Sequence, residues 1–124
     1  MQKVILVTGA TDGIGFETAK MLTSQGHHVL IHGRNPSKLQ HVEQTLSQLG
    51  NVSSYVADLS DLNDVDKLSQ QLISDFETID VVINNAGVFS TQQPRTEEGL
   101  DVRFVVNTLA PYKLTKALLP LLPS

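Results

Sequence analysis

The chain has 124 residues, of which 40% are apolar and 18% are charged, and its formal net charge is −4. This is the composition of one ordinary globular domain, and the acidic balance argues against a nucleic-acid or anionic-membrane partner, both of which need a basic face. The absence of cysteine excludes disulfides and thiolate metal sites and fits a reducing compartment. We expect a cytoplasmic protein, and we expect no metal site.

Apolar, strand-like runs alternate with helical periods along the chain. In chain order, the sequence predicts strands at residues 3–8, 29–32, 52–57 and 79–84. Between and after them it predicts helices at residues 13–25, 36–49, 62–76 and about 100–119. Asn35 before Pro36 is a typical helix start, and Ser60 or Asp61 caps the third helix. A loop with Gly87, Pro94 and Gly99 precedes the last helix, which Pro120 and Pro123 end.

This alternation predicts an α/β fold. The expected architecture is a doubly wound parallel sheet of the Rossmann type, with strand order 3-2-1-4 and helices on both faces. Ligands of such sheets bind at the carboxyl ends of the strands, so the residues directly after each strand are the informative ones.

The first strand leads into a glycine-rich turn, Thr8-Gly9-Ala10-Thr11-Asp12-Gly13-Ile14-Gly15. Glycines let a phosphate approach the backbone, and the helix that follows directs its free N–H groups and positive dipole end at that phosphate. A lone glycine-rich turn can be a plain loop, but its place between a first strand and a first helix favours a phosphate site. No Gly-Lys-Ser/Thr follows, which excludes a P-loop NTPase.

The second strand ends at His32-Gly33-Arg34-Asn35. An NAD site has an acid about 20 residues after the glycine turn, where it binds the ribose 2′-hydroxyl. This sequence has Gly33 and Arg34 there, and a guanidinium suits a 2′-phosphate, so NADP(H) is expected over NAD(H). The alternative is that Arg34 faces solvent and Asn35 only caps the next helix.

The third strand ends at Asp58-Leu59 and the fourth at Asn84-Asn85-Ala86-Gly87. Taken singly, both segments are typical of turns. Together with the glycine turn they resemble the short-chain dehydrogenase/reductase family, whose members carry T-G-x-x-x-G-x-G, an Asp and N-N-A-G after the first, third and fourth strands. The stretch from Gly99 through Asn107 to Pro111 looks most like the retinol-dehydrogenase-like or general reductase branches.

The resemblance covers the whole chain, and it implies one NAD(P)-binding domain over residues 1–124. The implied activity is hydride transfer between a nicotinamide and a small carbonyl or alcohol substrate. The implied cofactor contacts are Gly9, Thr11, Asp12, Gly13, Ile14, Gly15, Arg34, Asn35, Asp58, Leu59, Asn85, Ala86 and Gly87. Asp12 departs from the many NADP-preferring members that have a basic residue within the turn.

Asn107 matches the family's active-site Asn, whose carbonyl holds a water in a proton relay. Pro111 lies four residues later and has no N–H, so the Asn107 carbonyl loses its usual helical partner and the helix is expected to bend. The alternative is a kinked helix at the surface, in which Asn107 has ordinary hydrogen-bond partners and no catalytic role.

The family also needs a Ser and a Tyr-x-x-x-Lys pair that follow a fifth strand, and this chain ends at Ser124. Tyr112 and Lys116 match the spacing, but Tyr112 points about 140° away from Asn107 around the helix. We therefore expect an N-terminal fragment of an oxidoreductase. A non-catalytic nucleotide-binding module is the alternative, and Gly33-Arg34 argue against a methyltransferase. The apolar fourth strand would lie at a sheet edge, which favours homo-oligomers.

The isolated 124-residue chain is accordingly predicted to have no dehydrogenase or reductase activity. The measurement is NADPH turnover with a panel of carbonyl compounds. Turnover that disappears in Tyr112→Phe would contradict the prediction, because it would make Tyr112 the proton donor.

Overall fold

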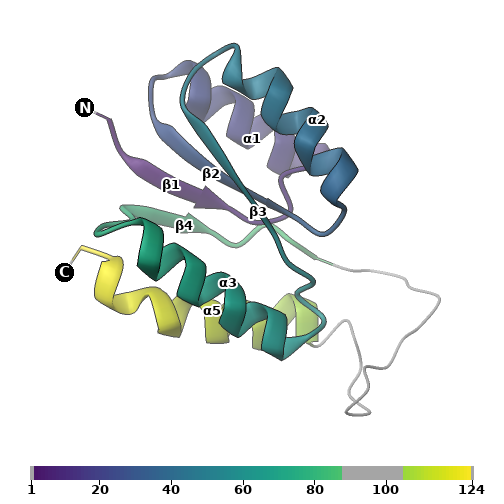
Figure 1. Cartoon of the computed structure of the whole chain (residues 1–124), viewed down its shortest axis with the longest axis vertical. Helices are drawn as coiled ribbons and strands as arrows, with labels where there is room; N and C mark the ends of the chain where they lie inside the picture. Colours follow the sequence, from purple (N-terminus) through teal and green to yellow (C-terminus); the bar gives the residue numbers. More distant parts are fainter. Residues whose placement is uncertain (1, 88–104, 124) are drawn as a thin grey trace.

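The computed structural model describes residues 2–87 and 105–123 of the chain, and four of the described segments are strands (Figure 1). The strands form one parallel sheet in the order β3-β2-β1-β4, so the predicted doubly wound order is confirmed. Their bounds are β1 Val4–Val7, β2 His28–Gly33, β3 Val52–Val56 and β4 Val81–Ile83. β3 begins at the predicted residue, and the other strand ends differ from the predicted ones by one or two residues, as element boundaries commonly do.

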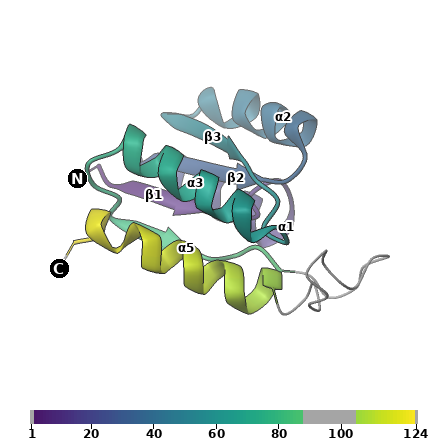
Figure 2. The same ribbon diagram turned by 60° about the horizontal axis from the view of Figure 1, so that its bottom comes forward.

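Helices cover both faces of this sheet. Helices α1 and α2 lie on one face and α3 and α5 on the other, as the two views in Figures 1 and 2 show. Their bounds are α1 Gly13–Ser24, α2 Pro36–Ser47, α3 Leu62–Asp75 and α5 Ala110–Leu118. Among the described helices, none is both long and apolar enough to cross a membrane.

Alternate residues of the central strands supply two separate cores. Ile5, Val7 and Ile31 belong to the cluster beneath α1 and α2, whereas Leu6 and Leu30 belong to the cluster beneath α3 and α5. All five side chains are at most 4% exposed. The continuous apolar runs in the sequence therefore reflect strands that are buried on both faces.

The caps of the helices largely follow the sequence. The side chain of Asn35 accepts hydrogen bonds from the backbone N–H groups of Ser37 and Lys38, at 2.9 and 3.1 Å, and so caps α2. Of the two candidates before α3, Asp61 is the cap, since its side chain accepts from the N–H of Asn63 at 2.9 Å.

The last predicted helix is not uniform. Its expected start near residue 100, together with Pro94 and Gly99, lies outside the described residues. The described part begins with a π-helical turn, Val105–Leu109, continues as α5 and ends in a 3-10 turn, Leu119–Leu121. Pro111 cannot donate to the Asn107 carbonyl four residues earlier, and in a π-helical turn a carbonyl pairs instead with the N–H group five residues later.

Two neighbouring residues of α3 provide a test of this packing. Leu72 is 0% exposed and Ile73 is 45% exposed, so only the first fills the core. We predict that Leu72→Ala lowers the free energy of unfolding by about 2–5 kcal/mol, because it leaves a cavity. Ile73→Ala, the matched control, should change it by at most about 1 kcal/mol. Urea unfolding followed by circular dichroism measures both, and equal losses would contradict the assignment of the buried face.

Candidate functional site

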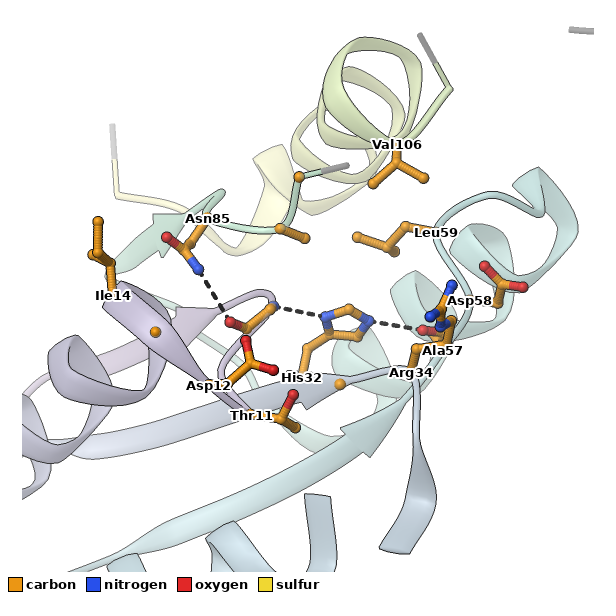
Figure 3. A pocket seen from close by; sticks show the side chains of 15 residues that line it. Thr11, Asp12, Ile14, His32, Arg34, Ala57, Asp58, Leu59, Asn85 and Val106 are labelled. Carbon is orange, nitrogen blue, oxygen red and sulfur yellow. Dashed lines mark hydrogen bonds between the residues drawn. The ribbon is translucent and has the colours of Figure 1, made fainter. Parts of the chain in front are cut away.

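A cavity of about 380 Å³ opens where the carboxyl ends of the four strands meet, and Figure 3 shows it from close by. Each wall of the cavity follows a different strand. The residues that line it are Gly9, Thr11, Asp12, Gly13, Ile14, His32, Gly33, Arg34, Ala57, Asp58, Leu59, Asn85, Ala86, Gly87 and Val106. The structure thus brings together all the sequence-predicted cofactor residues except Gly15 and Asn35.

The glycine turn after β1 packs tightly against the loop after β4. Gly9 has φ +63°, and a Cβ there would lie 2.8 Å from the Cα of Ala86. A Cβ on Gly15 would collide with the carbonyl oxygen of Gly9 and the side-chain amide of Asn85. Gly15 therefore lies beneath the turn, and its missing side chain is what allows the first turn of α1 to approach it.

Side-chain hydrogen bonds hold these two loops together. The buried Thr8 hydroxyl oxygen accepts from the backbone N–H groups of Asn85 and Ala86, at 3.0 and 3.1 Å. The Asn85 side-chain amide donates in return to the carbonyl oxygen of Gly9 at 3.0 Å. The first strand and the fourth are thereby fixed to each other at the cavity edge, and the Asn85 N–H₂ group serves the scaffold.

The wall after β3 combines a carboxylate with apolar side chains. One oxygen of Asp58 accepts from the N–H and the hydroxyl of Ser60, at 2.9 and 2.7 Å, and so shapes the turn. Leu59 is 6% exposed and Val106 is 7% exposed, and both line the cavity. The wall after β3 therefore presents an apolar surface with a carboxylate at its edge, and this surface suits a flat ring.

The charged rim lies at the ends of β1 and β2. Arg34 is exposed and lines the cavity, and the residue before it at the end of β2 is Gly33 and not an acid. Asp12 makes no capping bond to α1; its carboxylate pairs with the Lys38 ammonium at 3.2 Å. Asn35 caps α2 and lies outside the cavity lining, so its expected phosphate contact stays a prediction.

His32 lines the cavity but was absent from the sequence-predicted site. Its ring is buried, and Nδ1 accepts from the backbone N–H of Gly9 at 3.1 Å. Nε2 lies 2.8 Å from the carbonyl oxygen of Ala57. Burial lowers the pKa of His32, and the bond to Ala57 and the Asp58 carboxylate oppose that shift. The one signal in the sequence is a polar ring directly after the apolar run of residues 29–31.

Asn107, the expected active-site residue, lies apart from Tyr112, which the sequence already argued against as a catalyst. Asn107 is exposed and does not line the cavity, but a Cβ on Gly87 would lie 3.4 Å from its Oδ1. Tyr112 is 65% exposed and lies among Asn84, Thr115 and Lys116 on a different surface. Its ring therefore does not share the cavity with the glycine turn.

Comparison with known proteins places this geometry among oxidoreductases. The family model described as short chain dehydrogenase matches residues 3–124. Human polyprenol dehydrogenase is 38% identical over 94% of this chain and 36% of its own length. Mouse retinol dehydrogenase 14 is 34% identical over 98% of this chain and 40% of its own length. The crystal structure of a metagenomic short-chain oxidoreductase in complex with NADP superposes with a TM-score of 0.80 at 33% identity, covering 93% of this chain and 54% of the other.

The position of Gly15 beneath the glycine turn can be tested by measuring the stability of the protein. We predict that Gly15→Ala lowers the free energy of unfolding by about 1–3 kcal/mol, because the new methyl group displaces Gly9 and Asn85. The loss is expected even though alanine has the higher helix propensity. Glu17→Ala, at an exposed position of the same helix, is the control and should change stability by at most about 0.5 kcal/mol. A Gly15→Ala protein as stable as the wild type in urea would show that the turn has room to relax.

Proposed function

The chain belongs to the short-chain dehydrogenase family, and from that premise we propose that it forms the NADP(H) site of an oxidoreductase acting on a small alcohol or carbonyl compound. The single observation that carries the proposal is the cavity at the carboxyl edge, with a glycine turn on one side and Arg34 at the rim. The chain spans between about a third and about half of the length of the relatives it matches, so the complete reaction is proposed for the protein as a whole.

The residues present fit a dinucleotide. The cavity volume of about 380 Å³ falls within the range of small-molecule sites, roughly 300–1,000 Å³. At Gly13, apart from its chain neighbours and the backbone of α1, no heavy atom lies within 4 Å of the place where a side chain would start, so the turn is open at the start of α1. Those N–H groups, with the positive end of the helix dipole, would hold the pyrophosphate.

The other walls would hold the two nucleoside halves. Leu59 would cover the adenine ring while Asp58 accepts hydrogen bonds at its edge. Asn85, Ala86 and Gly87 would lie along the ribose and nicotinamide half. A bound nicotinamide supplies the hydride acceptor or donor of the reaction. Asn107 lies beside Gly87, and we assign it to the active-site end of this cavity.

Charge favours NADP(H) over NAD(H). Arg34 offers a guanidinium fork to a 2′-phosphate, whereas the carboxylate that would bind a free 2′-hydroxyl has no counterpart at Gly33. Asp12 brings a negative charge to the turn, but its pairing with Lys38 offsets that charge locally. The solved relative named as an NADP complex supports the same cofactor.

The substrate class follows the names of the curated relatives. Polyprenol and retinol dehydrogenases carry alcohols in their names, and both match nearly the whole of this chain. Val106, in the π-helical turn that also carries Asn107, lines the cavity with an apolar side chain, which suits an apolar ligand surface. We therefore propose an alcohol or carbonyl substrate of low polarity.

A titration separates the two cofactors. We predict that the purified protein binds NADPH more tightly than NADH, and that Arg34→Ala weakens NADPH binding roughly 10- to 150-fold, the value of a charged partner to a phosphate. NADH affinity should stay within about twofold, because NADH has no 2′-phosphate. Lys20→Ala, which removes an exposed cation from α1, is the matched control. Cofactor fluorescence at constant ionic strength provides the measurement, and equal affinities for both cofactors would refute the preference.

A further inference from the structure

We propose that His32 is a positioning residue of the cofactor site, whose neutral ring ties the glycine turn after β1 to the end of β3. The expected effect on cofactor binding rests on the proposed function. The link between the turn and β3 rests only on the hydrogen bonds of one buried ring. His32 lies at the end of the strand between β1 and β3, so one side chain reaches both neighbours.

The ring is the middle of a hydrogen-bonded chain across the cavity floor. Figure 3 draws this chain from Asn85 through Gly9 and His32 to Ala57. Gly9 is held on both sides, because its carbonyl oxygen accepts from Asn85 and its N–H donates to His32, at 3.0 and 3.1 Å. The peptide groups of the turn that is to receive the pyrophosphate are therefore oriented before any ligand arrives.

The partners dictate one tautomer. A carbonyl oxygen only accepts, so Nε2 of His32 must carry the hydrogen that it donates to Ala57. The N–H of Gly9 only donates, so Nδ1 must be unprotonated. Both bonds can exist together only in the neutral ring. A proton on Nδ1 would face the Gly9 N–H and remove the acceptor on which the turn depends.

The surroundings of the ring support the neutral form near pH 7. Burial lowers the pKa of His32 from its ordinary value of 6.5, and the Asp58 carboxylate after β3 opposes that shift. The other charged groups among the described residues that line the same cavity are Asp12 in the turn and Arg34 after β2. On the α3 side, Asp64 accepts from the backbone N–H of Asp58. The tie should accordingly be intact above the folded-state pKa and open as the pH falls through it.

Two conservative substitutions separate the two bonds of the ring. In His32→Asn the side-chain oxygen takes the place of Nδ1 and can accept from Gly9, but the side chain is too short to reach Ala57. In His32→Gln the amide reaches the place of Nε2 and can donate to Ala57, but it leaves Gly9 without its acceptor. Each variant removes one hydrogen bond, so a purely structural role should destabilise the two proteins alike.

The experiment compares NADPH affinity and thermal unfolding of the wild type and both variants. We expect His32→Gln to weaken NADPH binding roughly 2- to 12-fold, the range of one neutral hydrogen bond, and His32→Asn to stay within about twofold. The ratio of wild-type to His32→Asn affinity should fall as the pH is lowered from 7.5 to about 5.5. The titration of the NADPH phosphate is common to both proteins and cancels in that ratio. Equal affinity losses in the two variants, in step with their melting temperatures, would overturn the positioning role, as would an unchanged affinity in His32→Gln.

A second measurement keeps this inference distinct from the proposed function. Nitrogen NMR of the ligand-free protein reports whether Nδ1 or Nε2 of His32 carries the hydrogen. A hydrogen on Nε2 alone supports the tie, and a hydrogen on Nδ1 overturns it. If the wild type binds no nicotinamide nucleotide, the proposed function fails while this result still decides the state of the ring.

Discussion

The close approach of the turn after β1 to the loop after β4 is the constraint on which the site depends. β1 is paired on both sides, with β2 and with β4, so its carboxyl end cannot move without its neighbours. At that end, Gly9 packs against Ala86 at a distance that leaves no space for a side chain. Thr8 and Asn85 close the same contact with hydrogen bonds in both directions. These contacts hold the floor of the cavity together between the ends of β1 and β4.

The polar groups around this floor are of two kinds. The Thr8 hydroxyl, the Asn85 amide and the His32 ring are all engaged with backbone atoms of neighbouring strands. They are buried or partly buried, and leaving such groups unpaired would cost more than each bond contributes. The groups that face outward are different: the first N–H groups of α1, the guanidinium of Arg34 and the edge of Asp58. Side chains thus set the shape of the cavity, whereas backbone and charge remain for a ligand.

Local patterns predicted the fold and most of the cavity lining. Apolar runs, glycine breaks and the Asn35-Pro36 start depend on nearby residues, and the parallel order follows from their alternation. What the sequence could not predict depends on partners that are far away in the chain. The ring of His32 bonds to Gly9 and Ala57, 23 and 25 residues away, and nothing in its own neighbourhood indicates either. Gly15 likewise resembles a ligand-facing glycine until the positions of Gly9 and Asn85 are known.

Asp12 illustrates how a residue that looks wrong in sequence fits in three dimensions. An acid in the phosphate-binding turn should repel a dinucleotide, and a sequence comparison alone counts it against NADP(H). In the fold, Asp12 sits opposite the first turn of α2, and Lys38 there neutralises it across 3.2 Å. Both side chains are largely exposed, so the pair contributes little to stability. Its effect is on the field at the rim: Asp12 and Lys38 offset each other, so the turn adds little net charge beside Arg34, while the Asp58 carboxylate remains in the wall after β3. The pair also shows why the residue type at one motif position is a weak guide to cofactor choice. The charge that a ligand meets depends as well on residues of other elements, such as Lys38 of α2, which the motif does not include.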